Sequence, residues 1–167
     1  MRWLWIMLSH AFSACLWRGG IDVNEVLLDA LGMKDLSESS RERMRLAEVY
    51  LRECEEYLAK GDAVQASEKA YRAAEEVVKA LAERFRTPEY QRALEEGRWH
   101  TYLLSMASKT LAKSLGDWVV DGWNAAYDLH VWGGFHEGKL TVDYVRVGVN
   151  RVKAMFSEAR KLFEESR

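Results

Sequence analysis

The fold is decided by residues 61–85, which read GDAVQASEKAYRAAEEVVKALAERF. Gly61 ends a preceding helix, and Asp62 belongs to the residue types that cap the start of the next one. Small and apolar residues then recur every three or four positions, so they share one face of a helix. They are Ala63, Ala66, Ala70, Ala73, Ala74, Val77 and Leu81. Because small residues let a neighbouring helix approach closely, this helix and the one before it are expected to form an antiparallel hairpin.

Every other element is also expected to be a helix. A long helix, from about Ser40 to Lys60, follows a polar linker at residues 34–40. Thr87-Pro88 begins another, because proline is favoured at the first helical position, and Gly97 ends it. The remaining helices are expected through residues 103–116, from Asp117 to about Trp132, and from Thr141 to Phe163. The sequence predicts an all-α fold, an antiparallel helical bundle of five to six main helices.

The N-terminal residues differ in composition from this bundle. Residues 1–17 are apolar and rich in tryptophan, too short to span a bilayer, and flanked by a single early positive charge. We expect these residues to form a helix that docks by its apolar face. The alternatives are a short signal peptide that ends near Cys15 and a true start site further downstream. A second, short helix is expected to open at Asp22 and close near Gly32. We expect residues 1–36 to form a helical arm and residues 37–167 to form the bundle domain.

The composition fits a globular protein of the cytoplasm with no membrane partner. Hydrophobic residues make up 49% of the chain and charged residues 30%. With only two cysteines, Cys15 and Cys54, a thiolate zinc site is excluded and a disulfide framework is not expected. Cys54 is expected to pack as a small apolar side chain. Scarce amides and many charges fit a thermophilic source.

Charged residues are expected on helix faces. The face of residues 62–85 opposite the alanines carries oppositely charged neighbours one turn apart, from Glu68 to Lys79. The net charge of −2 gives no global attraction to nucleic acid or anionic lipid. Two local groups of arginines could bind either, but solvated helix faces explain them more simply. These are Arg41, Arg43 and Arg45, and Arg84, Arg86, Arg92 and Arg98.

The candidate site lies in residues 121–137, which read DGWNAAYDLHVWGGFHE. An apolar helix there runs into a turn at Gly133-Gly134 and carries side chains that move protons near neutral pH. Asn124 and His130, six residues apart, are expected to border one groove. The candidate catalytic residues are His130, His136 and Glu137; the candidate binding residues are Asn124, Asp128, His130, His136 and Arg98. We expect no metal, because helical metal-ligand spacing is absent, and no cofactor.

This segment fits three interpretations. A histidine beside carboxylates is held in one tautomer, which suits general acid/base catalysis. A second interpretation is a binding groove. The third is a well-packed bundle end, in which His130 and His136 only satisfy the hydrogen bonds that burial demands. Arg98 lies at a helix start, where anions are favoured, although packing on Trp99 is the simpler explanation.

Three blocks of the chain resemble the archaeal PaREP family. They are residues 61–81, Gly97-Arg98-Trp99 and residues 123–137, in that order, and the likeness covers roughly residues 20–165. That family in turn resembles the HEPN superfamily and the C-terminal helical domain of kanamycin nucleotidyltransferase. The resemblance implies an HEPN-like bundle and a homodimer, with a nucleotidyltransferase or nucleic acid as a further partner.

The resemblance also bears on catalysis. In ribonuclease members of HEPN, an arginine and a histidine separated by four to six residues form the active site. His130 matches the histidine, but the arginine positions hold Ala125, Asn124 and Trp123. Asparagine cannot supply the permanent charge that stabilises the transition state. Unless Arg98 or a partner subunit supplies that cation, the resemblance favours a non-catalytic module that binds a nucleotide, a nucleic acid or a nucleotidyltransferase. A metal-independent ribonuclease and a helical interaction scaffold are the alternatives.

Overall fold

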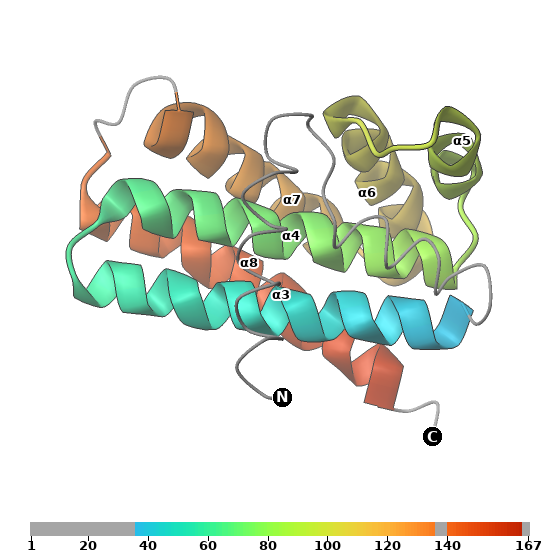
Figure 1. Ribbon diagram of the computed structural model, residues 1–167, viewed down its shortest axis with the longest axis horizontal. Coiled ribbons are helices and arrows are strands. Elements are labelled where there is room, and N and C mark those ends of the chain that lie inside the picture. Colours follow the sequence, from blue (N-terminus) through green and yellow to red (C-terminus); the bar gives the residue numbers. More distant parts are fainter. Residues whose placement is uncertain (1–35, 136–139, 165–167) are drawn as a thin grey trace, which may run out of the picture. The chain divides into compact units, whose positions relative to one another are not determined.

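The computed structural model describes residues 36–135 and 140–164, and every regular element in them is helical (Figure 1). The elements are α3 (Leu36–Ala59), α4 (Ala63–Arg84), α5 (Pro88–Glu96), α6 (Thr101–Leu115), α7 (Trp118–Asp128), the π-helix η1 (Leu129–Phe135) and α8 (Val142–Glu164). The predicted all-α bundle is confirmed. None of these helices is long and apolar enough to cross a membrane. Residues 1–35, with the expected short helix, lie outside the described residues.

Several helix boundaries follow from capping residues that the sequence shows. Asp62 and Thr87 each accept a hydrogen bond from the backbone N–H three residues ahead, at 3.0 and 3.3 Å. Thr141 does the same before α8, at 3.3 Å. Gly97 ends α5 in the left-handed region, with φ 69°. These side chains satisfy N–H groups that a helix start leaves without partners, so the predicted starts of α4, α5 and α8 are confirmed.

One boundary differs from the prediction. α3 begins at Leu36, inside the segment expected to be a linker. Residues 36–40 are mostly polar, so their pattern resembles a loop. The acidic Glu38 in the first turn nevertheless favours a helix start, because it interacts with the positive end of the helix dipole.

α4 is the central helix. It packs against α5, α6, α7, η1 and α8, and α3 runs beside it (Figure 1). Its predicted apolar face is fully buried from Ala66 to Leu81. Cys54 of α3 is also fully buried, as expected, and its thiol donates to the Ala66 carbonyl at 3.2 Å. Burial raises the pKa of the Cys54 thiol to about 12, so it stays protonated near neutral pH.

α7 and α8 cross closely at two glycines. A Cβ atom at Gly122 would lie 2.5 Å from the Cβ of Met155, and one at Gly148 would lie 2.9 Å from the Cγ of Leu129. Real side chains do not approach so closely, so each glycine makes room for a residue of the facing helix. The crossing therefore fixes the position of α8 beside α7 and η1.

The expected turn at Gly133-Gly134 is instead helical. The chain continues from α7 as the π-helix η1, which runs through both glycines to Phe135. Gly133 is buried, and a Cβ atom there would lie 2.4 Å from the Ser67 hydroxyl of α4. Glycine is therefore needed for close packing against α4 rather than for a turn. Short π-helical segments occur often at functional sites.

Candidate functional site

His130 projects from η1 towards α4. Its Nδ1 lies 3.0 Å from Oε1 of Glu68, and its ring stacks on that of Tyr71 with centroids 4.2 Å apart. The side chains of His130 and Glu68 are 31% and 29% exposed. The carboxylate holds the imidazole in one orientation and leaves Nε2 as the nitrogen available to a ligand. We call Glu68, Tyr71 and His130 the histidine site.

Aromatic side chains back this site without sealing it. The Tyr71 ring lies 5.7 Å from that of Trp123, which is almost completely buried. Trp132 of η1 is 51% exposed, so it does not cover the imidazole as a core residue would. Burial raises the pKa of the Tyr71 hydroxyl above its usual range, and the hydroxyl therefore remains a hydrogen-bond donor. The site is accordingly buried at its base and open at its rim.

Asn124 and Asp128 lie elsewhere, in a groove between α7 and α8. The groove has a volume of 480 Å³, and neither wall includes His130. Six residues are about one and two-thirds turns of a helix, so Asn124 and His130 project from different sides. The structure therefore does not bring these two residues into one groove. We call the space lined by Asp121, Asn124, Asp128, Tyr144, Val147 and Arg151 the α7–α8 groove.

Arg98 lies in the short connection before α6. Its Nε donates to Nε2 of His100 at 2.9 Å, and that nitrogen is also 3.2 Å from Oε2 of Glu96. Within residues 36–135 and 140–164, no hydrogen bond or ion pair joins Arg98 to His130. In the described residues Arg98 thus contacts His100 and not the histidine site. The other two candidates, His136 and Glu137, lie outside the described residues.

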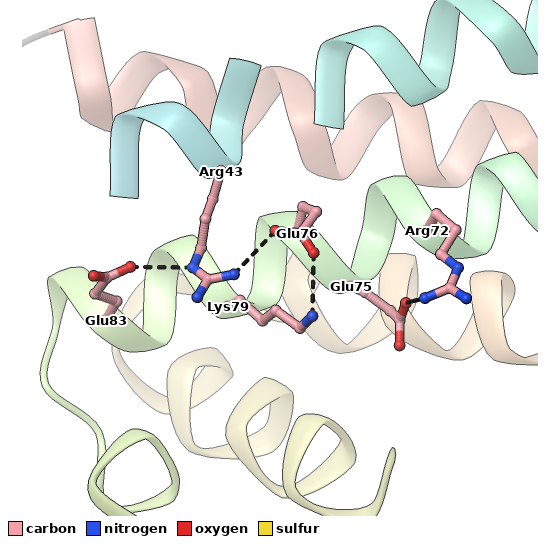
Figure 2. Close-up of polar contacts among 6 residues, drawn as sticks. All are labelled: Arg43, Arg72, Glu75, Glu76, Lys79 and Glu83. Carbon is pink, nitrogen blue, oxygen red and sulfur yellow. Dashed lines mark hydrogen bonds and ion pairs between the residues drawn. The ribbon is translucent and has the colours of Figure 1, made fainter. Parts of the chain in front are cut away.

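A second group of polar residues was not predicted from the sequence. The guanidinium of Arg43 lies 3.2 Å from Glu76 and 3.2 Å from Glu83, and Lys79 lies 3.1 Å from Glu76 (Figure 2). All four side chains are at least nine-tenths buried. The interpretation of Arg43 as part of a solvated helix face is therefore wrong, because Arg43 is turned towards α4. We call these four residues the buried ion-pair cluster.

Glu75 lies on α4 between the cluster and the histidine site. Arg72 contacts it at 3.2 Å (Figure 2), and the Tyr71 hydroxyl is hydrogen-bonded to it. Desolvation by burial raises the pKa of the Glu75 carboxyl, and the nearby Lys79 and Arg72 only partly oppose this. Charged and polar contacts thus continue along α4 from Glu68 to Glu83.

Glu75→Gln is expected to stabilise the protein near neutral pH. Because the folded state raises the pKa of Glu75, this carboxyl favours folding most below its unfolded pKa, and that contribution is lost as the pH rises through the folded pKa. Glutamine carries no charge to desolvate, so the gain in melting temperature should grow with pH, to about 2–4 °C at about pH 7. Thermal unfolding followed by circular dichroism would measure it. A lower melting temperature of the variant at neutral pH would contradict this account.

In the part of the chain that the structure describes, no group of three His, Cys, Asp or Glu side chains could hold a metal ion. The histidine site offers one imidazole and one carboxylate, which are already bonded to each other.

The family model for the archaeal PaREP1/PaREP8 family matches residues 42–156. The chain belongs to this family. The matched residues include the histidine site, the α7–α8 groove and the buried ion-pair cluster, so all three lie within the PaREP1/PaREP8 domain. No curated protein matches the chain.

Solved structures resemble this PaREP1/PaREP8 chain over most of the bundle. The crystal structure of a Sulfolobus solfataricus protein is 38% identical, and the match covers 69% of this chain and 93% of that one, with a TM-score of 0.63. A solution structure of the same structural-genomics target is 37% identical, covers 72% and 93% of the two chains, and also has a TM-score of 0.63. The helical bundle is therefore shared with an archaeal relative.

Proposed function

We propose that this PaREP1/PaREP8 protein is a non-catalytic helical binding module. The observation that carries the proposal is the α7–α8 groove, whose walls include Asn124 and Asp128. Neither side chain has a hydrogen bond or ion pair with the described residues, so both are available to a ligand. The proposed partner is a nucleotide, a nucleic acid end or a nucleotidyltransferase. The groove has the size of a small-molecule site.

The contacts of His130 support binding over catalysis. Cleavage of a phosphodiester needs a cation to stabilise the charge that develops on phosphorus-bound oxygens. Asn124, which occupies an arginine position of the ribonuclease motif, lines the groove on another side of the helix. Arg98 is bonded to His100. Among the described residues, the histidine site therefore holds a potential acid or base that has no hydrogen bond or ion pair with a cation.

A metal-independent ribonuclease is the second candidate, and the Glu68–His130 pair favours it. A carboxylate bonded to one imidazole nitrogen orients the ring for proton transfer at the other. Both side chains are partly exposed, so a substrate could reach them. This geometry is shared by catalytic and purely structural histidines, and an activity measurement separates them.

The purified protein is expected not to cleave structured RNA. Wild type, His130→Ala and Glu68→Gln would be incubated with the same RNA, and the products separated by size. Cleavage by wild type that both variants lose would establish the ribonuclease and overturn the binding-module proposal. Cleavage that persists equally in all three would not involve the histidine site.

We also propose that the protein is a homodimer, as its resemblance to HEPN proteins implies. Light scattering of the full chain would show twice the monomer mass. A monomer across the working range of concentration would exclude any site shared between subunits.

A further inference from the structure

We propose that the α7–α8 groove binds a cationic amphipathic helix of a partner protein. This inference rests on the proposed function, because it names the kind of partner that the same groove takes. Among the described residues, the two most exposed large apolar side chains, Tyr144 and Val147, both line this groove. They are 57% and 61% exposed and lie about one turn apart on α8. Apolar surface that gathers at a groove, rather than being scattered singly, marks a contact with a partner.

The shape of the groove fits a helix. Its lining runs from Asp121 to Asp128 on α7 and from Tyr144 to Arg151 on α8, so about two turns of each helix face it. On both walls the lining residues recur with the helical period. The side chains of a third helix recur with the same period, so they can pack between the two walls as helices do in a bundle.

A helix suits this surface better than an extended segment does. An extended segment gains its affinity mainly by adding to the edge of a sheet, where the main chain of its partner is free to bond. Every regular element in residues 36–135 and 140–164 is helical, so the described surface offers no such edge. A helix satisfies its own backbone hydrogen bonds and needs only side-chain contacts from the groove.

The charges of the groove define the chemistry of its partner. Asp121 and Asp128 are both exposed, and neither side chain has a hydrogen bond or ion pair with another described residue. Of the described residues that line the groove, Arg151 alone is cationic, so the lining is net negative. The two carboxylates would repel the phosphates of a nucleic acid and attract lysine or arginine. Of the partners proposed above, these charges therefore favour a protein.

The spacing of the carboxylates sets the spacing of the cations on the partner. Asp121 and Asp128 are seven residues apart on one helix, which places them about 10 Å apart along its axis. Two cations seven residues apart on the docked helix would lie at the same separation. A stripe of apolar side chains beside these cations would cover Tyr144 and Val147.

Calorimetric titration of the full chain with two synthetic peptides tests the proposal. Both peptides carry the same helical stripe of leucines. One has lysines seven residues apart beside the stripe, and the other has glutamates at the same positions. We expect saturable one-to-one binding of the lysine peptide, a gain of helix by circular dichroism, and much weaker binding of the glutamate peptide. A proline in the middle of the lysine peptide should abolish binding, because it breaks the helix.

Three double variants locate the binding. Asp121→Asn with Asp128→Asn should weaken binding of the lysine peptide about tenfold. Glu56→Gln with Glu95→Gln is the matched control, because it removes the same charge from exposed carboxylates of α3 and α5 that do not line the groove. The control should leave the affinity unchanged.

Tyr144→Ala with Val147→Ala tests the apolar contact. Because both side chains are exposed, their loss should leave the helix content and the melting temperature of the free protein nearly unchanged. Binding of the lysine peptide should weaken about tenfold or more, since aromatic side chains contribute strongly to interfaces.

Four results would overturn the inference. They are no saturable binding of the lysine peptide at millimolar concentration, equal binding of the glutamate peptide, binding that survives the central proline, and binding that the groove variants weaken no more than the control does. Loss of self-association in Tyr144→Ala with Val147→Ala, without peptide binding by wild type, would instead assign the groove to a second copy of the chain. The RNA assay decides the proposed function separately, so a protein that neither cleaves RNA nor binds the peptide would lose only this partner.

Discussion

Arg43→Ala is expected to lower the free energy of unfolding by about 3–5 kcal/mol. The substitution leaves the carboxylates of Glu76 and Glu83 buried without the guanidinium that lies between them (Figure 2). An unpaired buried charge costs far more than a surface ion pair contributes. Arg43→Lys should recover only part of the loss, because one ammonium cannot match the two-sided fork of arginine. Urea unfolding followed by circular dichroism measures all three proteins.

Arg45→Ala provides the matched control for this prediction. Arg45 lies on the same helix two residues away and pairs with Glu42, but its side chain is 68% exposed. Its loss should change the stability by no more than about 1 kcal/mol. Equal effects of the two substitutions would mean that burial of the ion-pair cluster contributes nothing to the fold.

Gly122→Val is expected to cost about 3 kcal/mol or more. Even the first carbon of a side chain at this position would lie 2.5 Å from the Cβ of Met155. A Cβ atom is fixed by the backbone and cannot rotate away, so α8 itself would have to move. The same move would open the crossing at Gly148 and Leu129. Thermal unfolding and the dispersion of side-chain methyl signals would both report the change.

Asn124→Val, two residues further along α7, is the control for Gly122→Val. It shows how much of the loss comes from the low helix propensity of valine and how much from the contact with Met155. It introduces the same branched side chain on an exposed face of the same helix. The expected loss there is below about 1 kcal/mol. A comparable loss at both positions would assign the effect to the valine and not to the contact with Met155.

The sequence was sufficient for the helices and for their packed faces. Asp62, Thr87 and Gly97 mark helix ends by local chemistry that needs no tertiary partner. The alanines of α4 repeat with the helical period, so their burial follows from the pattern. Predictions of this kind succeed because cause and effect lie within a few residues of each other.

The polar core could not be predicted in the same way. Glu76, Lys79 and Glu83 repeat with the spacing of an ordinary solvated face, and Arg43 lies on a different helix. A charge every turn is found both on surfaces and in buried networks. What separates the two cases is an oppositely charged residue 33 or 40 positions away, which only the packing of α3 on α4 brings close.

The sequence predicted which segment carries the candidate site, but it did not predict which residues contact one another there. His130 was a candidate, but its carboxylate partner is Glu68, 62 residues earlier, and not a neighbour on its own helix. The glycines at 133 and 134 suggested a turn, since glycine is common in turns. In the structure Gly133 lies inside a π-helix, where the absence of a side chain allows close contact with Ser67. The reason for this glycine therefore lies on another helix, α4.

The central position of α4 has a consequence for how the protein opens. Its amide hydrogens lie beneath helices on several sides, so water reaches them only when the surrounding bundle separates (Figure 1). Their exchange with deuterium should therefore require global unfolding, whereas α5, with few buried residues, should exchange through brief local openings. The buried ion pairs that link α4 to Arg43 would then persist until the whole fold is lost.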